Sequence, residues 1–142
     1  MAESASNEYN VEGGNFSRAG YASSEIKKLL KRMNVDSAII KRTVVASYEA
    51  EVNIVAHAYS GTVKVGINEE EIAICFEDSG PGIPDIEKAM QEGFSTASSK
   101  VREMGFGAGM GLPNIKKNVD NMDINSEVGK GTKLIIMIKR NP

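Results

Sequence analysis

Residues 36–59, DSAIIKRTVVASYEAEVNIVAHAY, decide the fold of this 142-residue chain. Asp36 is a favourable helix N-cap because its carboxylate can accept hydrogen bonds from free backbone N–H groups, and Gly61 is a typical stop signal. The pattern predicts one long helix that ends at about Tyr59. Apolar residues at helical spacing predict its apolar face: Val44, Val45, Tyr48, Val52, Val55 and Tyr59.

A polar stripe follows the same helix. Glu49, Asn53 and His57 are spaced by four residues and therefore share one side of it. An amide oxygen and a carboxylate on one stripe suit a hydrated magnesium ion, with Asn53 as ligand and Glu49 as base toward a hydroxyl. Glu51 competes for the base role, but it lies about 200° around the helix from Glu49. A solvated helix face is the alternative for each residue, and for His57 we favour a structural hydrogen bond.

The rest of the chain alternates between helix and strand signals. We expect residues 1–7 to be a disordered terminus and residues 8–142 to form one domain. Strands are expected within 9–16, at an edge, and over 62–67, 71–77, 122–127 and 132–139; helices are expected over 22–33, 85–91 and 113–121. The predicted class is α/β.

Composition excludes several classes of function. The formal net charge of −2 and the pI of about 5.5 argue against a nucleic-acid-binding surface. No apolar run approaches the ~20 residues that cross a bilayer, and the start lacks the regions of a signal peptide. We therefore expect no membrane association and a cytoplasmic location.

The single cysteine and single histidine limit the metal chemistry. They are too few for a zinc site made by the protein alone, so a bound metal is expected to have oxygen ligands. Cys75 lies in the apolar run 72–76, where we expect an inert core residue.

Glycines mark the candidate ligand-binding loops. Eight of the 14 fall in three clusters: Gly80 and Gly82; Gly105, Gly107, Gly109 and Gly111; Gly129 and Gly131. The middle cluster precedes a helix, so its free N–H groups and the helix dipole favour an anion. It ends a polar stretch, 92–111, that is too long for an ordinary connection. A flexible loop is the alternative.

An acidic residue ends one of the expected strands. Asp78 is followed by two glycines around a proline, which is either a simple turn or the wall of a pocket. In a pocket, the carboxylate could accept a hydrogen bond from an exocyclic amine.

Taken in order, these segments resemble the four sequence boxes of the GHKL ATPases, which include gyrase B and the histidine kinases. Glu49-Ala-Glu-Val-Asn53 is similar to the first box and Asp78-Ser-Gly80-Pro-Gly82 to the second. Gly107-Ala-Gly109-Met-Gly111 is similar to the third, and Gly129-Lys-Gly131-Thr132 to the fourth. The resemblance implies the Bergerat ATP-binding fold, an α+β two-layer sandwich whose mixed, mainly antiparallel sheet carries helices on one face.

The resemblance also implies roles for individual residues. Glu49 corresponds to the general base and Asn53 to the magnesium ligand. Asp78 corresponds to the carboxylate that holds the adenine amino group, and Thr132 supports it through water. The remaining residues implied to bind ATP or ADP lie in the second and third boxes: Gly80, Gly82, Ile83, Gly105, Gly107, Ala108, Gly109, Met110, Gly111 and Leu112.

Within this superfamily the chain most resembles the anti-sigma-factor serine/threonine kinases of bacterial partner switching. The run from Gly105 to Pro113 looks like the switch kinase of the stressosome branch. Sporulation-type kinases carry an arginine where Gly107 stands, and either Lys100 or Arg102 is a candidate replacement. The implied reaction uses Mg-ATP to phosphorylate a STAS-domain antagonist, with a sigma factor or a PP2C-type phosphatase as a competing partner.

Three alternatives compete with this interpretation. A histidine-kinase catalytic domain would need a phosphoacceptor histidine, but the only histidine is His57. A binding module could use ATP only to set its shape, without phosphotransfer. An ATP-hydrolysing clamp would need further domains. A homodimer is also possible, since Ile39, Ile40 and Ile54 suit either a core or a dimer face.

Overall fold

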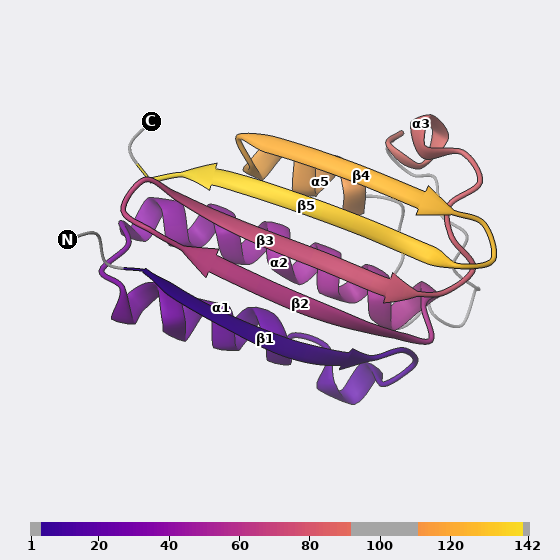
Figure 1. Ribbon diagram of the computed structural model, residues 1–142, viewed down its shortest axis with the longest axis horizontal. Helices are drawn as coiled ribbons and strands as arrows, with labels where there is room; N and C mark the ends of the chain where they lie inside the picture. Colours follow the sequence, from indigo (N-terminus) through magenta and orange to yellow (C-terminus); the bar gives the residue numbers. More distant parts are fainter. Residues whose placement is uncertain (1–3, 92–110, 141–142) are drawn as a thin grey trace.

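Five strands of the computed structural model form one sheet with the order β1-β2-β3-β5-β4, and every pair is antiparallel (Figure 1). The structure describes residues 4–91 and 111–140. The strands are β1 Ala5–Glu12, β2 Ser60–Ile67, β3 Glu71–Ser79, β4 Asn121–Glu127 and β5 Gly131–Lys139.

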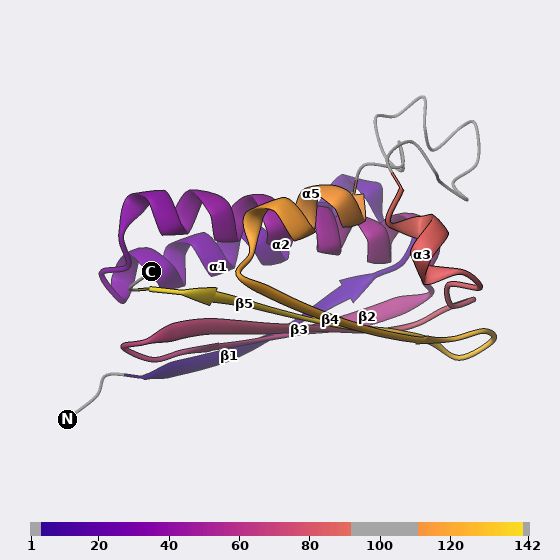
Figure 2. The ribbon, with the colours of Figure 1, turned by 90° about the horizontal axis from the view of Figure 1, so that it is seen from above.

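The long helices cover one face of this sheet (Figure 2). The helices are η1 Phe16–Arg18, α1 Tyr21–Arg32, α2 Ser37–His57, α3 Ile86–Ala89 and α5 Gly111–Asn118. α2 lies between α1 and α5 and packs against both. None of the described helices lies on the opposite face, which we call the open face. The predicted α/β two-layer fold with helices on one face is therefore confirmed, although the sheet of the described residues is wholly antiparallel and not mixed.

Strand residues alternate between the core and the open face. Val63, Ile74, Phe76 and Ile136 point inward and are almost completely buried. Cys75 lies between Ile74 and Phe76 in the sequence and so points to the open face, where it is half-buried. Its predicted place in the core is wrong, because a strand sends adjacent residues to opposite faces. Burial nevertheless raises the pKa of its thiol, which keeps the thiol protonated.

The core-facing side of α2 differs from the predicted apolar face. Val52 and Val55 are buried as expected, but Val45 and Tyr48 are 38% and 40% exposed, and Tyr59 lies beyond the helix end. The buried side is formed by Ile39, Ile40, Thr43, Ala46, Ser47, Ala50 and Ile54. Small residues let the helix approach the sheet closely. The stripe with the largest side chains therefore did not predict which side of α2 faces the core. Ile39, Ile40 and Ile54 all belong to the core.

The ends of α2 agree with part of the sequence prediction. Asp36 caps the helix, since its Oδ2 accepts a hydrogen bond from the Ala38 N–H at 3.1 Å. The helix ends at His57, two residues before the predicted Tyr59. Gly61 is not the stop signal but part of β2, where a Cβ would lie only 2.8 Å from the Ile54 side chain.

The first strand begins earlier than predicted. Residues 5–7 pair with the end of β2, with Ala5 opposite Ile67, and so are not part of a disordered terminus. The strand is largely polar because it lies at the sheet edge, where Ala5, Tyr9 and Val11 contribute to the core. α5 also begins earlier, at Gly111 rather than Pro113, and ends at Asn118.

Candidate functional site

The C-terminal half of α2 meets the start of α5. Glu49 and Asn53 are half-buried on the side of α2 that faces α5. A Cβ on Gly111, the first residue of α5, would lie 3.0 Å from Oδ1 and 3.2 Å from Nδ2 of Asn53. The amide of Asn53 therefore lies directly beside the N-terminal end of a helix, where backbone N–H groups have no partner within the helix.

The end of α2 also meets the end of β3. The Tyr59 N–H donates a hydrogen bond to the Ser79 carbonyl at 2.8 Å. A Cβ on Gly80 would lie 3.0 Å from the Cα of Ala58 and 3.3 Å from Oδ1 of Asp78. Glycine at position 80 thus allows the backbone after β3 to pass the last turn of α2, and this brings the first two sequence boxes to one end of the sheet.

Asp78 is held from the neighbouring strand. Its Oδ1 accepts a hydrogen bond from the Thr132 N–H at 3.1 Å. Burial raises the pKa of the Asp78 carboxyl, and the Thr132 hydrogen bond opposes this rise. A Cβ on Gly131 would overlap the Asp78 carbonyl oxygen, so glycine is needed where β5 begins beside Asp78. One N–H occupies only part of the acceptor capacity of this carboxylate.

Ser126 connects the second and fourth boxes. Its Oγ accepts a hydrogen bond from the Ile83 N–H at 2.7 Å and lies 2.8 Å from Oγ1 of Thr132. The Gly129 N–H donates to the Pro81 carbonyl at 2.9 Å, and Gly82, with φ +78°, lies against the Glu127 carbonyl. Sequence reasoning missed Ser126, because a lone serine in a polar strand carries no signal of its own.

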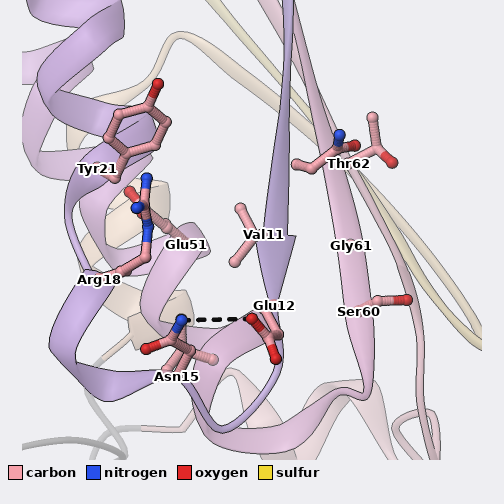
Figure 3. A pocket seen from close by; sticks show the side chains of 11 residues that line it. Val11, Glu12, Asn15, Arg18, Tyr21, Glu51, Ser60, Gly61 and Thr62 are labelled. Atoms are coloured by element: carbon pink, nitrogen blue, oxygen red, sulfur yellow. Dashed lines mark hydrogen bonds between the residues drawn. The ribbon is translucent and has the colours of Figure 1, made fainter.

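Glu51 does not belong to this cluster. It is 2% exposed, and its carboxylate accepts hydrogen bonds from three backbone N–H groups near the start of α1: Gly20 at 3.0 Å, Ala22 at 3.1 Å and Ser23 at 2.9 Å. Figure 3 shows it reaching from α2 toward the segment that carries Arg18 and Tyr21. Glu51 therefore caps α1 from a neighbouring helix, and the prediction that it lies away from the Asn53 stripe is confirmed.

His57 ends α2 in a partly buried position. Burial lowers the pKa of its imidazole, so the ring is neutral at pH 7. A neutral ring cannot supply a positive charge to a bound anion, which agrees with the structural role that the sequence favoured.

Most of the third box lies outside the described residues. This applies to Gly105, Gly107, Ala108, Gly109 and Met110, and to the candidate replacements Lys100 and Arg102. Gly111 and Leu112 are described; Gly111 is beside Asn53, and Leu112 is buried in the core.

A hollow of about 590 Å³ opens at the same end of the sheet. Asp78, Ser126, Gly131 and Thr132 line it, together with open-face residues of β2 and β3. Glu49 and Asn53 are not among its lining residues. The described part of the chain thus presents two polar clusters, one around Asn53 and one around Asp78, joined through the contact of Gly80 with Ala58.

The donor groups fit a magnesium ion that is bound mainly by a ligand. Among residues 4–91 and 111–140, no three His, Cys, Asp or Glu side chains gather into a metal cage. The amide oxygen of Asn53 and the carboxylate of Glu49 are oxygen donors on one stripe. Magnesium commonly binds through one or two such protein oxygens plus the phosphates of a nucleotide.

No helix in the described part of the chain has the length and apolar character needed to cross a membrane.

Comparison with known proteins identifies the family. Residues 40–142 match the sequence profile described as histidine kinase-, DNA gyrase B-, and HSP90-like ATPase. The chain belongs to this family of ATPases. The resemblance seen in the four boxes is therefore confirmed.

Individual relatives carry regulatory names. The serine/threonine-protein kinase RsbT of Bacillus subtilis is 38% identical over 84 residues, which cover 55% of this chain and 57% of RsbT. The anti-sigma F factor of Caldanaerobacter subterraneus is 34% identical over 139 residues, which cover 81% of this chain and 91% of that protein. The anti-sigma F factor of Thermoanaerobacter sp. strain X514 is 38% identical over 96 residues, or 63% of its length.

Proposed function

We propose that this chain is a serine/threonine protein kinase of the partner-switching type, which binds Mg-ATP and phosphorylates a STAS-like antagonist protein. One observation carries the proposal: the amide of Asn53 lies against the N-terminal end of α5, and Glu49 lies one turn earlier on the same stripe of α2. The relative named serine/threonine-protein kinase supports the phosphotransfer, and the relatives named anti-sigma F factor support the regulatory setting.

Asp78 would select adenine. One of its oxygens accepts the Thr132 N–H, and the remaining acceptor capacity suits the exocyclic amino group of adenine. Guanine presents a carbonyl oxygen at that position, which would face a carboxylate without a proton between them. Gly80, Gly82 and Ile83 would form the adjoining wall, held in place through Ser126.

Asn53 would hold the magnesium ion through its amide oxygen. When bound, the ion neutralises negative charge on the phosphates of the nucleotide. The first N–H groups of α5, beginning at Gly111, would face the same phosphates, because a helix N-terminus carries a partial positive charge. The third-box glycines, from Gly105 onward, would complete this wall.

Glu49 would act as the general base. A serine or threonine hydroxyl of the acceptor attacks the γ-phosphorus, its proton passes to the Glu49 carboxylate, and the bond between the γ-phosphorus and the β–γ bridging oxygen breaks to release ADP. Glu49 suits this role because it is half-buried beside Asn53, whereas Glu51 is 2% exposed and its carboxylate already accepts three backbone N–H groups.

The regulatory setting would be a cytoplasmic partner switch that controls transcription. In that scheme the STAS-like antagonist competes with a sigma factor or a PP2C-type phosphatase for this chain. The second candidate function is an ATP-dependent binding module without phosphotransfer. It is favoured by the anti-sigma F relative that aligns over 91% of its length, since its name describes antagonism of a sigma factor.

The test is phosphotransfer from labelled ATP to purified STAS domains encoded in the same genome. We expect magnesium-dependent labelling of one of them, stable to acid as phosphoserine or phosphothreonine is. Labelling that acid removes would indicate phosphohistidine and contradict the proposal. ATP-dependent complex formation without any labelling would favour the binding module instead.

A further inference from the structure

Charge is distributed unevenly between the helical layer and the rest of the chain. Residues 16–57 and 111–118, which form η1, α1, α2 and α5, contain nine lysines and arginines against four acidic residues, and one of the four is the buried Glu51. These segments carry a net charge of +5 within a chain of net charge −2, so the remainder carries −7. The helical layer is therefore a basic surface on an acidic protein.

Three large apolar side chains are exposed on this basic layer. Tyr21 is 45% exposed, Val45 is 38% exposed and Tyr48 is 40% exposed. A Cβ on Gly20 would lie 3.4 Å from the Tyr48 ring, so this ring rests beside the residue that precedes Tyr21. We call Tyr21, Val45 and Tyr48 the aromatic ridge.

Basic groups flank the aromatic ridge. The guanidinium of Arg18 lies 4.6 Å from the centre of the Tyr21 ring, and Figure 3 shows the two side chains near each other at the start of α1. Lys41 is exposed one helical turn before Val45. Exposed tyrosines beside an arginine are typical of the energetic centre of a protein interface, and a lysine at its margin adds positive charge.

The aromatic ridge adjoins the candidate base. Val45 is four residues before Glu49, so it lies on the same side of α2 one turn away, and Tyr48 is the preceding residue. A protein seated on the ridge would cover α2 up to Glu49.

We infer that the aromatic ridge is the docking surface for the acceptor protein, which contacts it through an acidic surface with an apolar centre. The inference rests on the proposed function, because it places the acceptor of that reaction. Charge complementarity selects an acidic partner. A symmetric second copy would bring two basic layers together, which like charges oppose.

Photocrosslinking in the source cells identifies the occupant. A photoreactive phenylalanine analogue is introduced at position 48 of the full chain and, as a control, at position 59, because Tyr59 is 75% exposed but lies outside the basic layer. We expect an acidic protein to be captured from position 48 and not from position 59. Capture of a second copy, of nucleic acid or of lipid, or equal capture from both positions, would overturn the inference.

The captured protein is then purified and its binding measured against variants. We expect Tyr48→Ala to weaken binding on the order of 30-fold and Tyr59→Ala to leave it unchanged. In phosphotransfer, Tyr48→Ala should raise KM for the acceptor while kcat and ATP affinity stay constant. Equal binding by both variants would overturn the docking surface.

The two proposals fail differently. Binding is measured with the parent and with Glu49→Gln. If binding depends on Tyr48 but the parent transfers no phosphate, the kinase is refuted and the docking surface is retained. Transfer that is insensitive to Tyr48 would do the reverse.

Discussion

The two flanks of α2 each carry a glutamate, and the two carboxylates differ in burial and in hydrogen bonding. Glu51 faces α1, is 2% exposed and accepts three backbone hydrogen bonds. Glu49, two residues earlier, is half-buried on the flank that faces α5 and Asn53. A buried carboxylate that accepts three backbone N–H groups stabilises the fold and is not accessible to a substrate. The flank toward α1 therefore stabilises the fold, and we call it the architectural flank. The flank toward α5 carries the proposed catalytic groups, and we call it the chemical flank.

The largest expected effect is on the chemical flank. Replacing Glu49 with glutamine removes the proposed base but keeps the size of the side chain, so phosphotransfer should fall about 10²–10⁴-fold. ATP affinity and the thermal unfolding midpoint should stay at parent values. Single-turnover transfer of labelled phosphate measures the loss.

Glu25→Gln is a matched control, because Glu25 is a glutamate on α1 that lies away from the site. Its carboxylate pairs with the Lys28 ammonium at 3.2 Å. If Glu49→Gln transferred phosphate at the parent rate, the assignment of Glu49 as the base would be wrong.

The second largest effect is on the architectural flank. Glu51→Ala leaves three N–H groups at the start of α1 without their acceptor, which should cost about 3 kcal/mol of unfolding free energy or more. For a domain of this size the corresponding fall in Tm is roughly 10 °C. Urea unfolding followed by circular dichroism measures the change.

If Glu51→Ala folded with parent stability, the assignment of the two flanks would be wrong. Hydrogen exchange should localise the loss to α1, since α2 keeps its own cap at Asp36.

The smallest effect concerns Asp78, where function and stability are expected to oppose each other. Because burial raises its pKa, the native state disfavours the charged carboxylate. The stability it contributes is complete below the ordinary Asp pKa of 3.8 and is lost as pH rises through the higher native value. Asp78→Asn should therefore melt at or above the parent temperature at pH 7, and the difference should shrink as the pH falls toward 3.8.

The same substitution should weaken ATP binding by roughly 10–100-fold, since an amide N–H would face the adenine amino group. Calorimetry with ATP and GTP tests this directly. If the parent bound both nucleotides equally, the adenine assignment would not stand, whatever the melting temperatures.

Local rules predicted much of the fold and part of the candidate site. The Asp36 cap follows from side-chain chemistry, and the common flank of Glu49 and Asn53 follows from helix geometry, because both depend only on neighbours in sequence. The hairpin 62–77 was also predictable, since residues 62–67 alternate and the apolar run 72–76 follows after a short polar turn.

What could not be predicted depends on contacts distant in sequence. Nothing near Gly20 indicates that Glu51 caps α1, and nothing near Ser126 indicates its bond to Ile83. The core side of α2 was misjudged for a related reason: its small residues become informative only once the sheet lies against them. Residues 5–7 appeared unstructured because an edge strand gains its order from the partner strand.

The capping of α1 by Glu51 has a consequence for synthesis on the ribosome. The start of α1 has no side-chain cap of its own, and its acceptor lies 28–31 residues later in the chain. At about 5–20 residues per second, α1 emerges several seconds at most before Glu51 follows it. A helix of 12 residues is marginal alone in water. The first turn of α1 therefore gains its hydrogen-bond acceptor only after α2 has been synthesised as far as Glu51. In a nascent chain that ends before Glu51, α1 should be unfolded.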